Sequence, residues 1–161
     1  MIEVVYRREV SYPQPAVLSQ YFDLEHVEHV HPRSFGRARM VSTNHNIIAW
    51  ELEWPPVLGL IRLQSTFAQE YRPPWGIHAT ITRGFLRGTE ISVEINKTDA
   101  GTLVVEHYRI PLPAWLRAWI QRALVRSLDR VWEEDLAVKL PRGGWPGVPG
   151  VDNRNLPEHL A

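Results

Sequence analysis

The chain has 161 residues, 44% hydrophobic and 22% charged, which suits one globular domain and excludes a disordered or fibrous chain. Its 18 basic and 18 acidic residues balance, which argues against nucleic-acid or membrane-surface binding, and the absence of cysteine excludes disulfides, thiol nucleophiles and Cys-held zinc or iron–sulfur clusters. No apolar run approaches the roughly 20 residues that cross a bilayer, and no secretory signal pattern is present, so we expect a cytoplasmic protein.

The first part of the chain predicts one strand and two short helices. Residues 3–11 are rich in valine and end before a Tyr-Pro pair, which indicates a strand closed by a turn. Pro15 suits the first turn of a helix whose apolar residues span 16–22. A second helical turn is expected over residues 24–30, before Pro32 ends it.

The middle of the chain predicts a sheet. Apolar and polar residues alternate with a period of two in six segments separated by turn signals: 35–43, 47–54, 60–71, 76–83, 89–96 and 102–110. Because no helix separates these segments, they predict an antiparallel meander rather than a parallel sheet.

The strongest amphipathic pattern predicts one long helix from residue 114 to about residue 139. Its apolar stripe consists of Leu116, Ile120, Leu124, Leu128 and Val131. On the opposite side, Arg122, Arg126 and Arg130 repeat every four residues, as a solvated face or as a docking surface for an acidic partner. Residues 141–161 are rich in Pro and Gly and are expected to form an irregular tail.

The order of these elements resembles the START-like (SRPBCC) helix-grip fold over residues 1–140. The resemblance implies an α+β domain in which a seven-stranded curved antiparallel sheet wraps around a long carboxy-terminal helix, with two short helices after the first strand. It also implies a cavity between the sheet and the helix.

A cluster of histidines near residue 30 indicates metal chemistry. His26, His29 and His31 fall within six residues, and two imidazoles with one carboxylate form the facial triad of non-haem iron enzymes. Asp135 follows Val131 by four residues and so lies on the apolar stripe, where an ionised carboxylate needs a cation or hydrogen-bond donors. We predict that His26, His31 and Asp135 bind one metal ion, with His29 as the competing ligand.

Other acidic residues receive different roles. Asp23 lies three residues before His26, on one face of a helical turn, and fits the carboxylate that orients this imidazole through its second nitrogen. Glu133 and Glu134 point away from the apolar stripe by the roughly 100° per residue of a helix and are expected at the surface.

Residues 23–32 resemble the D-x-x-H-x-x-x-x-H segment in the catalytic domain of Rieske-type aromatic-ring oxygenases, especially the vanillate demethylase-like branch, and residues 132–138 resemble the E-D-x-x-V stretch on its last helix. That catalytic domain has a helix-grip fold. The resemblance implies that His26, His31 and Asp135 ligate Fe(II), although zinc also accepts such ligands, and that Asp23 links the iron to an electron-donating cluster. The Rieske domain is absent because this chain has no cysteine for its cluster, so a separate Rieske or ferredoxin-type protein would supply electrons.

Two hypotheses of different class follow. The first is the catalytic domain of a mononuclear non-haem iron oxygenase, an oxidoreductase of the ring-hydroxylating or demethylating type acting on a hydrophobic or aromatic substrate. The second is a START-like carrier that binds a lipid, polyketide or aromatic molecule without chemistry. The metal distinguishes them, because a carrier has no use for a buried carboxylate facing paired histidines.

Several side chains are candidates for the wall of the cavity. Tryptophans offer a large apolar surface with one polar group, and the two histidines fall within strand patterns, on the sheet surface or in the cavity. The candidates are Trp50, Trp119, Trp132, His78 and His107.

Overall fold

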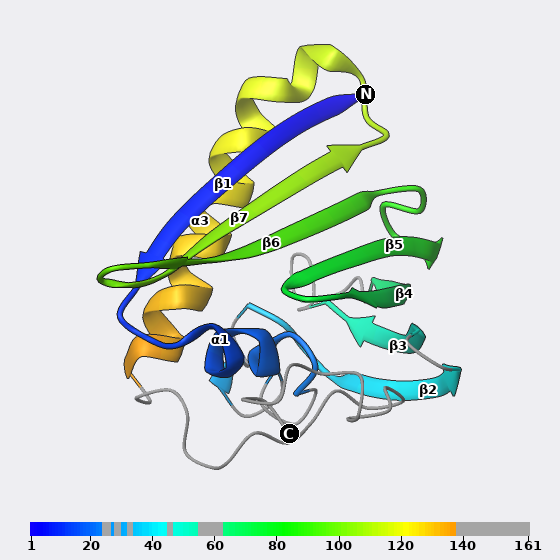
Figure 1. Cartoon of the computed structure of the whole chain (residues 1–161). Coiled ribbons are helices and arrows are strands. Elements are labelled where there is room, and N and C mark those ends of the chain that lie inside the picture. The colour runs from blue at the N-terminus through cyan, green and yellow to red at the C-terminus, as the bar shows by residue number, and fades with distance from the viewer. Residues whose placement is uncertain (24–26, 28–29, 32–33, 45–46, 55–62, 138–161) are drawn as a thin grey trace.

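The computed structural model describes residues 1–23, 27, 30–31, 34–44, 47–54 and 63–137 (Figure 1). Its strands are β1 (Ile2–Val10), β2 (Ala38–Asn44), β3 (Ile47–Glu53), β4 (Gln64–Arg72), β5 (Gly76–Gly84), β6 (Glu90–Thr98) and β7 (Gly101–Ile110). Its helices are α1 (Gln14–Gln20), the 3-10 turn η1 (Ala114–Leu116) and α3 (Arg117–Ala137).

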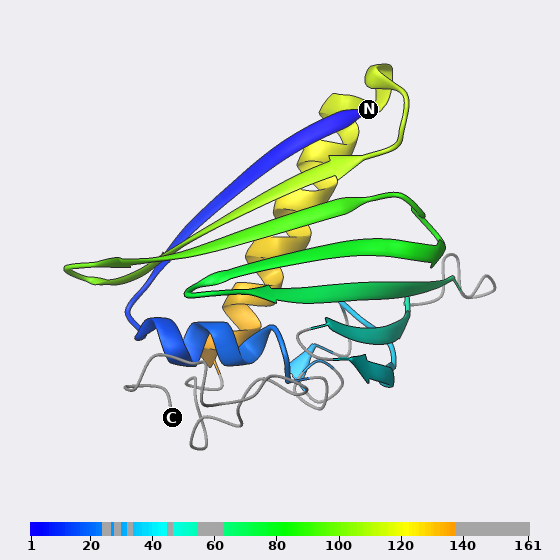
Figure 2. The ribbon, with the colours of Figure 1, turned by 45° about the vertical axis from the view of Figure 1, so that its right-hand side comes forward.

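All seven strands form one antiparallel sheet in the order β1-β7-β6-β5-β4-β3-β2. Consecutive strands from β2 to β7 are neighbours, and β1 closes the sheet by pairing with β7, from Ile2 opposite Ile110 to Val10 opposite Thr102. The sheet curves around α3, and α1 lies beside the carboxy-terminal end of α3 in both ribbon views (Figures 1 and 2). The helix-grip architecture predicted from the sequence is confirmed.

Strand alternation decides which side chains face α3. On β7, Val104 and Glu106 are buried on the concave face, while His107, the residue after Glu106, points to the convex face. On β5, Ile77 and Ala79 are buried and His78 lies on the other face. Parity along each strand therefore determines the wall of any space between the sheet and the helix.

Helix α3 turns its predicted stripe toward the sheet, and Leu128 is the stripe residue that is buried. Leu128, Trp132 and Asp135 are its buried residues, which confirms that Asp135 belongs to the apolar side. Near its amino terminus, Ile120 and Leu124 pack with the buried pair Ile2 and Ile110 from the sheet edge. None of the helices in the described part of the chain is long and apolar enough to cross a membrane.

The predicted boundaries differ from the structure mainly at element ends. The long helix begins with a 3-10 turn, and regular α-helix starts only at Arg117. The strand expected from residue 35 begins at Ala38, because Gly36 and Arg37 join Glu53 through irregular backbone hydrogen bonds. Most of the predicted turn over 24–30, residues 60–62 of the third predicted sheet segment and the tail 141–161 lie outside the described residues.

Candidate ligand-binding site

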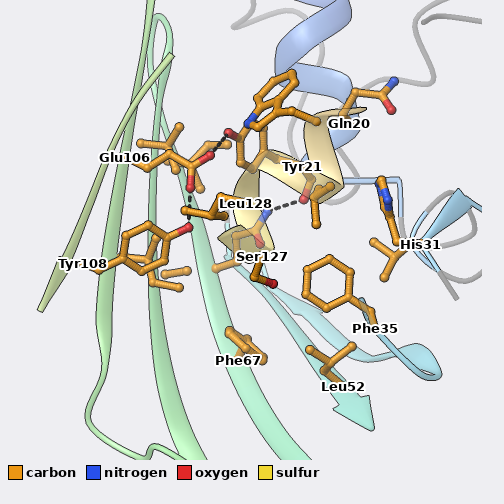
Figure 3. Close-up of a pocket in the computed structure, with 18 of the residues that line it drawn as sticks. Gln20, Tyr21, His31, Phe35, Leu52, Phe67, Glu106, Tyr108, Ser127 and Leu128 are labelled. Carbon is orange, nitrogen blue, oxygen red and sulfur yellow. Dashed lines mark hydrogen bonds between the residues drawn. The ribbon is translucent and has the colours of Figure 1, made fainter. Parts of the chain in front are cut away.

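A cavity of about 230 Å³ lies between α3 and the concave face of the sheet. Its wall is mostly apolar and aromatic, and Figure 3 shows part of it. The side chains contributed by the sheet and the α1–β2 connection include Phe35, Trp50, Leu52, Phe67, Ile91 and Val93. Leu124, Leu128, Val131 and Trp132 are contributed by α3. Such a wall suits a flat apolar molecule.

The aromatic floor of the cavity is held in place by strand pairing. Trp50 on β3 lies opposite Phe67 on β4, and their rings stack with centroids 4.3 Å apart at an interplanar angle of 10°. The Trp50 indole donates to Gln69 Oε1 over 3.1 Å, and Gln69 Nε2 donates to the Tyr21 carbonyl over 2.7 Å. The floor is thus connected through hydrogen bonds to the end of α1, which limits its motion.

One side of the cavity holds a buried carboxylate. Glu106 on β7 is 3% exposed, and its Oε1 accepts a hydrogen bond from the Tyr21 hydroxyl over 2.7 Å. Its Oε2 accepts a hydrogen bond from the Tyr108 hydroxyl, and the Trp132 side chain is a third donor. These residues come from β7, the end of α1 and α3, and Figure 3 shows Tyr21 and Tyr108 directed toward the carboxylate. Three neutral donors around one carboxylate favour its ionised form.

Burial dominates the acid–base properties of this cluster. Desolvation raises the pKa of Glu106 above its usual value, although the hydrogen bonds from Tyr108, Tyr21 and Trp132 oppose the rise. Burial and the adjacent Glu106 carboxylate raise the pKa of Tyr21 and of Tyr108 well above the usual range. Both phenols therefore remain neutral donors at every physiological pH.

The other side of the cavity holds an imidazole between two carboxylates. His31 is 3% exposed, and its Nε2 lies 2.9 Å from Asp135 Oδ1 while its Nδ1 lies 2.8 Å from Glu134 Oε2. The ring also makes an edge contact with Phe35. In Figure 3, His31 lies across the cavity from Glu106 and Tyr108.

The two carboxylates favour the protonated imidazole. Burial alone would lower the pKa of His31, but hydrogen bonding and charge from Asp135 and then Glu134 outweigh it and raise the pKa above its usual value. An imidazolium that donates from both ring nitrogens satisfies both acids at once. The structure therefore gives Asp135 the partner that its position on the buried stripe requires.

The structure brings some of the predicted site residues together and separates others. His31 meets Asp135, and Trp50 and Trp132 line the cavity. His26 and its competitor His29 lie outside the described residues. Asp23 is half-buried after α1 and is not part of the cavity wall.

Three predicted wall residues lie elsewhere, which corrects their assignment to the cavity. Trp119 is 67% exposed because it lies on the side of α3 opposite Leu128. His78 and His107 point to the convex face, where both pair in register with Ser92 of β6. The alternation of side chains along each strand puts both histidines on the outer sheet surface, which is one of the two positions expected from the sequence.

Sequence reasoning missed four polar residues. Glu134 was expected at the surface, but its long side chain reaches His31 from the edge of the buried face. Glu106 and Tyr108 carried a usable signal, because they share the parity of the buried Val104 on one strand. Tyr21 lies at the end of the first helix, and nothing in the sequence pairs it with β7.

Comparisons with known proteins agree on the fold. No protein-family model matches the chain, and no curated protein matches it significantly. Among solved structures, a START superfamily protein from Mycobacterium smegmatis superposes with a TM-score of 0.71 at 14% identity, covering 84% of this chain and 97% of that one. An AHSA1-like protein from Aeromonas hydrophila gives a TM-score of 0.64 at 13% identity, covering 88% and 97%.

A third similar structure is part of a larger protein. The di-domain ARO/CYC StfQ from the steffimycin biosynthetic pathway gives a TM-score of 0.65 at 11% identity, covering 85% of this chain and 49% of StfQ. At these identities the similarities show a START-like helix-grip fold, and they do not single out the catalytic domain of Rieske-type oxygenases.

The His31 cluster predicts a pH-dependent stability. A raised folded-state pKa means that His31 contributes its full stabilisation below the unfolded value of about 6.5 and loses it as the pH rises through the folded value. We expect His31→Gln to lower the free energy of unfolding by about 3 kcal/mol near pH 5.5 and by clearly less near pH 9. Urea unfolding followed by circular dichroism measures both values.

The matched control is His78→Gln on the convex face, which should change stability by less than about 0.5 kcal/mol. Equal destabilisation by His31→Gln at both pH values would show that the imidazolium does not hold the two carboxylates together.

Proposed function

We propose that the protein binds a small, flat and largely apolar molecule in the cavity between α3 and the sheet. The observation that carries this proposal is the cavity itself, an aromatic-walled space of about 230 Å³ with a few polar groups at opposite sides. Pockets of this kind bind small molecules by apolar contact and orient them through few hydrogen bonds.

The arrangement of the wall supports binding of an aromatic ring system. The stacked pair of Trp50 and Phe67 supplies a planar surface, and Trp132 lies on the facing helix. Leu52 and Leu128 are also part of the wall. A flat ligand would make contacts with both the sheet and α3, and its burial would release water from both surfaces.

The comparisons support the same proposal. The similar structures include a START superfamily protein and the di-domain ARO/CYC StfQ from the steffimycin biosynthetic pathway. A helix-grip domain that holds a polycyclic or other hydrophobic molecule, with or without chemistry on it, is consistent with both. Chemistry on a ligand would first require that the ligand is bound, so we place binding first.

Filling the cavity should abolish binding. Ala79 on β5 is 6% exposed and lines the cavity, so in Ala79→Phe the added ring would occupy ligand space. We expect the variant to bind the neutral fluorescent probe N-phenylnaphthylamine at least about tenfold more weakly than the wild type in a titration. Ala123→Phe, at an exposed position of α3, is the matched control and should bind normally.

The experiment includes a check on folding, because overpacking costs about 1–3 kcal/mol. Thermal unfolding should show a cooperative transition for Ala79→Phe. A folded variant with wild-type affinity for the probe would mean that the probe, and the proposed ligand, does not occupy this cavity.

The contact between His31 and Asp135 supports a second candidate, the metal site of a non-haem iron enzyme. Two neighbouring ligand atoms on one metal ion lie about 3 Å apart, given bonds of about 2.1 Å, and the 2.9 Å between His31 Nε2 and Asp135 Oδ1 fits that spacing. Glu134 would then orient the imidazole through Nδ1.

The described residues alone do not complete such a site. They contain no group of three metal-ligating side chains, so the third ligand would have to come from outside them, where the predicted His26 and its competitor His29 lie. His31 would also need to lose its Nε2 proton to bind a metal, which the two acids oppose. We therefore derive no catalytic step through iron, and a separate electron donor remains a prediction of the sequence.

Metal content tests this candidate. If it holds, protein purified from iron-supplemented culture contains about one iron or zinc per chain by elemental mass spectrometry, and His26→Ala and Asp135→Asn each lose it. His78→Ala on the convex face is the control and keeps it. Wild-type protein with far less than one metal ion per chain, or variants with unchanged content, would rule the metal site out.

A further inference from the structure

The two acids that line the cavity differ in how their charge is met. Asp135 is paired with His31, which can carry a positive charge. Among the described residues, the donors to Glu106 are all neutral and come from Tyr21, Tyr108 and Trp132. No Lys or Arg belongs to the cavity wall within the described residues. Glu106 therefore places an uncompensated negative charge at the edge of an apolar space.

Such a charge is costly unless a cation meets it. Desolvation of a carboxylate in a protein interior costs several kcal/mol, and neutral hydrogen bonds return only part of this free energy. The raised pKa of Glu106 likewise indicates an incompletely compensated charge, because burial outweighs its three hydrogen bonds. A carboxylate has about four acceptor positions, so three donors leave one available to a ligand.

We propose that the cavity selects aromatic ligands that carry a protonated amine, placed against Glu106, and rejects aromatic carboxylates. This inference rests on the proposed function and names the ligand class. A ligand ammonium would fill the remaining acceptor position of Glu106 and neutralise its charge. The aromatic side chains of Trp132, Tyr108 and Tyr21 around the site add favourable cation–π contact. A ligand carboxylate would instead bring a second negative charge beside Glu106 into the same apolar space.

Three probes with one ring system test the charge preference. Naphthylmethylammonium, naphthylmethanol and naphthoate differ mainly in the charge of a small substituent. By isothermal titration near pH 7, we expect the ammonium to bind at least about tenfold more tightly than the alcohol, and naphthoate at least about tenfold more weakly. Failure of the wild type to bind any of the three would contradict the proposed function itself.

Substitutions assign the preference to one acid. Glu106→Gln keeps the shape but removes the charge, so the ammonium and the alcohol should bind within about threefold of each other. Tyr108→Phe removes one of the donors that favour the ionised form of Glu106, so the ammonium preference should decrease, which provides a second test if Glu106→Gln does not fold. Glu94→Gln, at an exposed acid of β6, is the matched control with unchanged preference.

Three results would overturn the inference while leaving ligand binding intact. One is equal affinity of the wild type for the ammonium and the alcohol. Another is a preference that survives in folded Glu106→Gln, recognised by its retained affinity for the alcohol. The third is a preference lost in Asp135→Asn and kept in Glu106→Gln, which would assign the selecting charge to the His31 side of the cavity.

A second inference comes from the exposed face of α3. Trp115 and Trp119 are 80% and 67% exposed, and Arg122 and Arg126 follow on the same side of the helix. Residues 114–128 contain no Asp or Glu, and Arg117, Arg122 and Arg126 make no ion pair within the described part of the chain. This Trp/Arg face lies at the end of the molecule near the amino terminus, away from α1 (Figures 1 and 2).

We infer that the Trp/Arg face binds the surface of an anionic lipid bilayer. Tryptophan favours the boundary between headgroups and acyl chains, and each arginine near an anionic surface contributes about 1 kcal/mol. Two protruding indoles are a small apolar area for a stable protein interface, which buries about 1,600 Å² in total, but they suffice for shallow insertion into headgroups. The positive charge of this face gives the required complementarity, because the next acid along the helix, Asp129, is engaged by Tyr6 and Arg8 of β1.

Vesicle co-sedimentation tests this inference. We expect the wild type to bind vesicles of phosphatidylcholine that contain about one third phosphatidylglycerol, and to bind pure phosphatidylcholine vesicles only weakly. Binding to the anionic vesicles should decrease at high salt. Trp115→Ala with Trp119→Ala, and Arg122→Gln with Arg126→Gln, should each reduce binding about tenfold or more. Met40→Ala with Val41→Ala, at exposed apolar positions of β2, is the control.

The alternative occupant is a second copy of the chain. Size-exclusion chromatography of the wild type and the double tryptophan variant distinguishes the two. A wild-type dimer that becomes a monomer in the variant, or equal binding to neutral and anionic vesicles, would contradict docking to an anionic membrane.

Discussion

The packing of α3 against a curved sheet is the constraint on which the rest of the structure depends. Close to its amino terminus the helix packs on the β1 edge, where Ile2 and Ile110 meet Ile120 and Leu124. Further along, the cavity separates it from β3 to β6. A straight cylinder cannot contact every strand of a curved sheet, so a space remains wherever the two surfaces diverge. In this chain, aromatic side chains from both surfaces line that space without filling it.

The same packing explains why two carboxylates are buried and why they are not equivalent. Asp135 enters from the helix and Glu106 from the sheet, and both are 3–4% exposed. The imidazole of His31 meets Asp135 with a group that can become charged, while the donors that Glu106 receives from the described part of the chain are all neutral. In a buried ion pair each charge is compensated by its partner, whereas a carboxylate held by neutral groups keeps part of its desolvation cost. The charge of Asp135 is thus compensated within the protein, and Glu106 is left with affinity for a cation.

The fold was predictable because its determinants are periodic. Alternation identified the strands, and helical phase identified the buried side of α3, including Asp135. The same phase argument, applied to the parity of Val104, Glu106 and Tyr108, would have found the second acid, but the adjacent buried Val105 obscures the alternation. Parity also explains the misassignment of His78 and His107, since residue type alone does not distinguish the two faces of a sheet. Helical phase would also have excluded Trp119, which lies nine residues, or about 180°, from Leu128.

Contacts between distant segments were harder to predict than the elements themselves. The reach of the Glu134 side chain to His31 depends on the angle at which the α1–β2 connection approaches α3, and no local pattern encodes that angle. The pairing of Tyr21 with Glu106 likewise joins residues 85 positions apart. Sequence periodicity gives the orientation of a side chain relative to its own element, whereas a site depends on how two elements approach each other.

Whole-chain charge was the least informative property, because electrostatic fields act locally. The chain is neutral overall, yet the charged residues in the amino-terminal half of α3 are all arginines. In the described residues, the cavity wall contains acidic side chains but no Lys or Arg. Arg117 and Asp135 are 18 residues apart on one helix, or about 27 Å at 1.5 Å per residue. Charges at that separation are screened from each other, since the Debye length is about 8 Å at physiological ionic strength. A partner at either end therefore meets the local charge, and neutrality of the sum neither prevents the Trp/Arg face from attracting anions nor prevents Glu106 from attracting a cation.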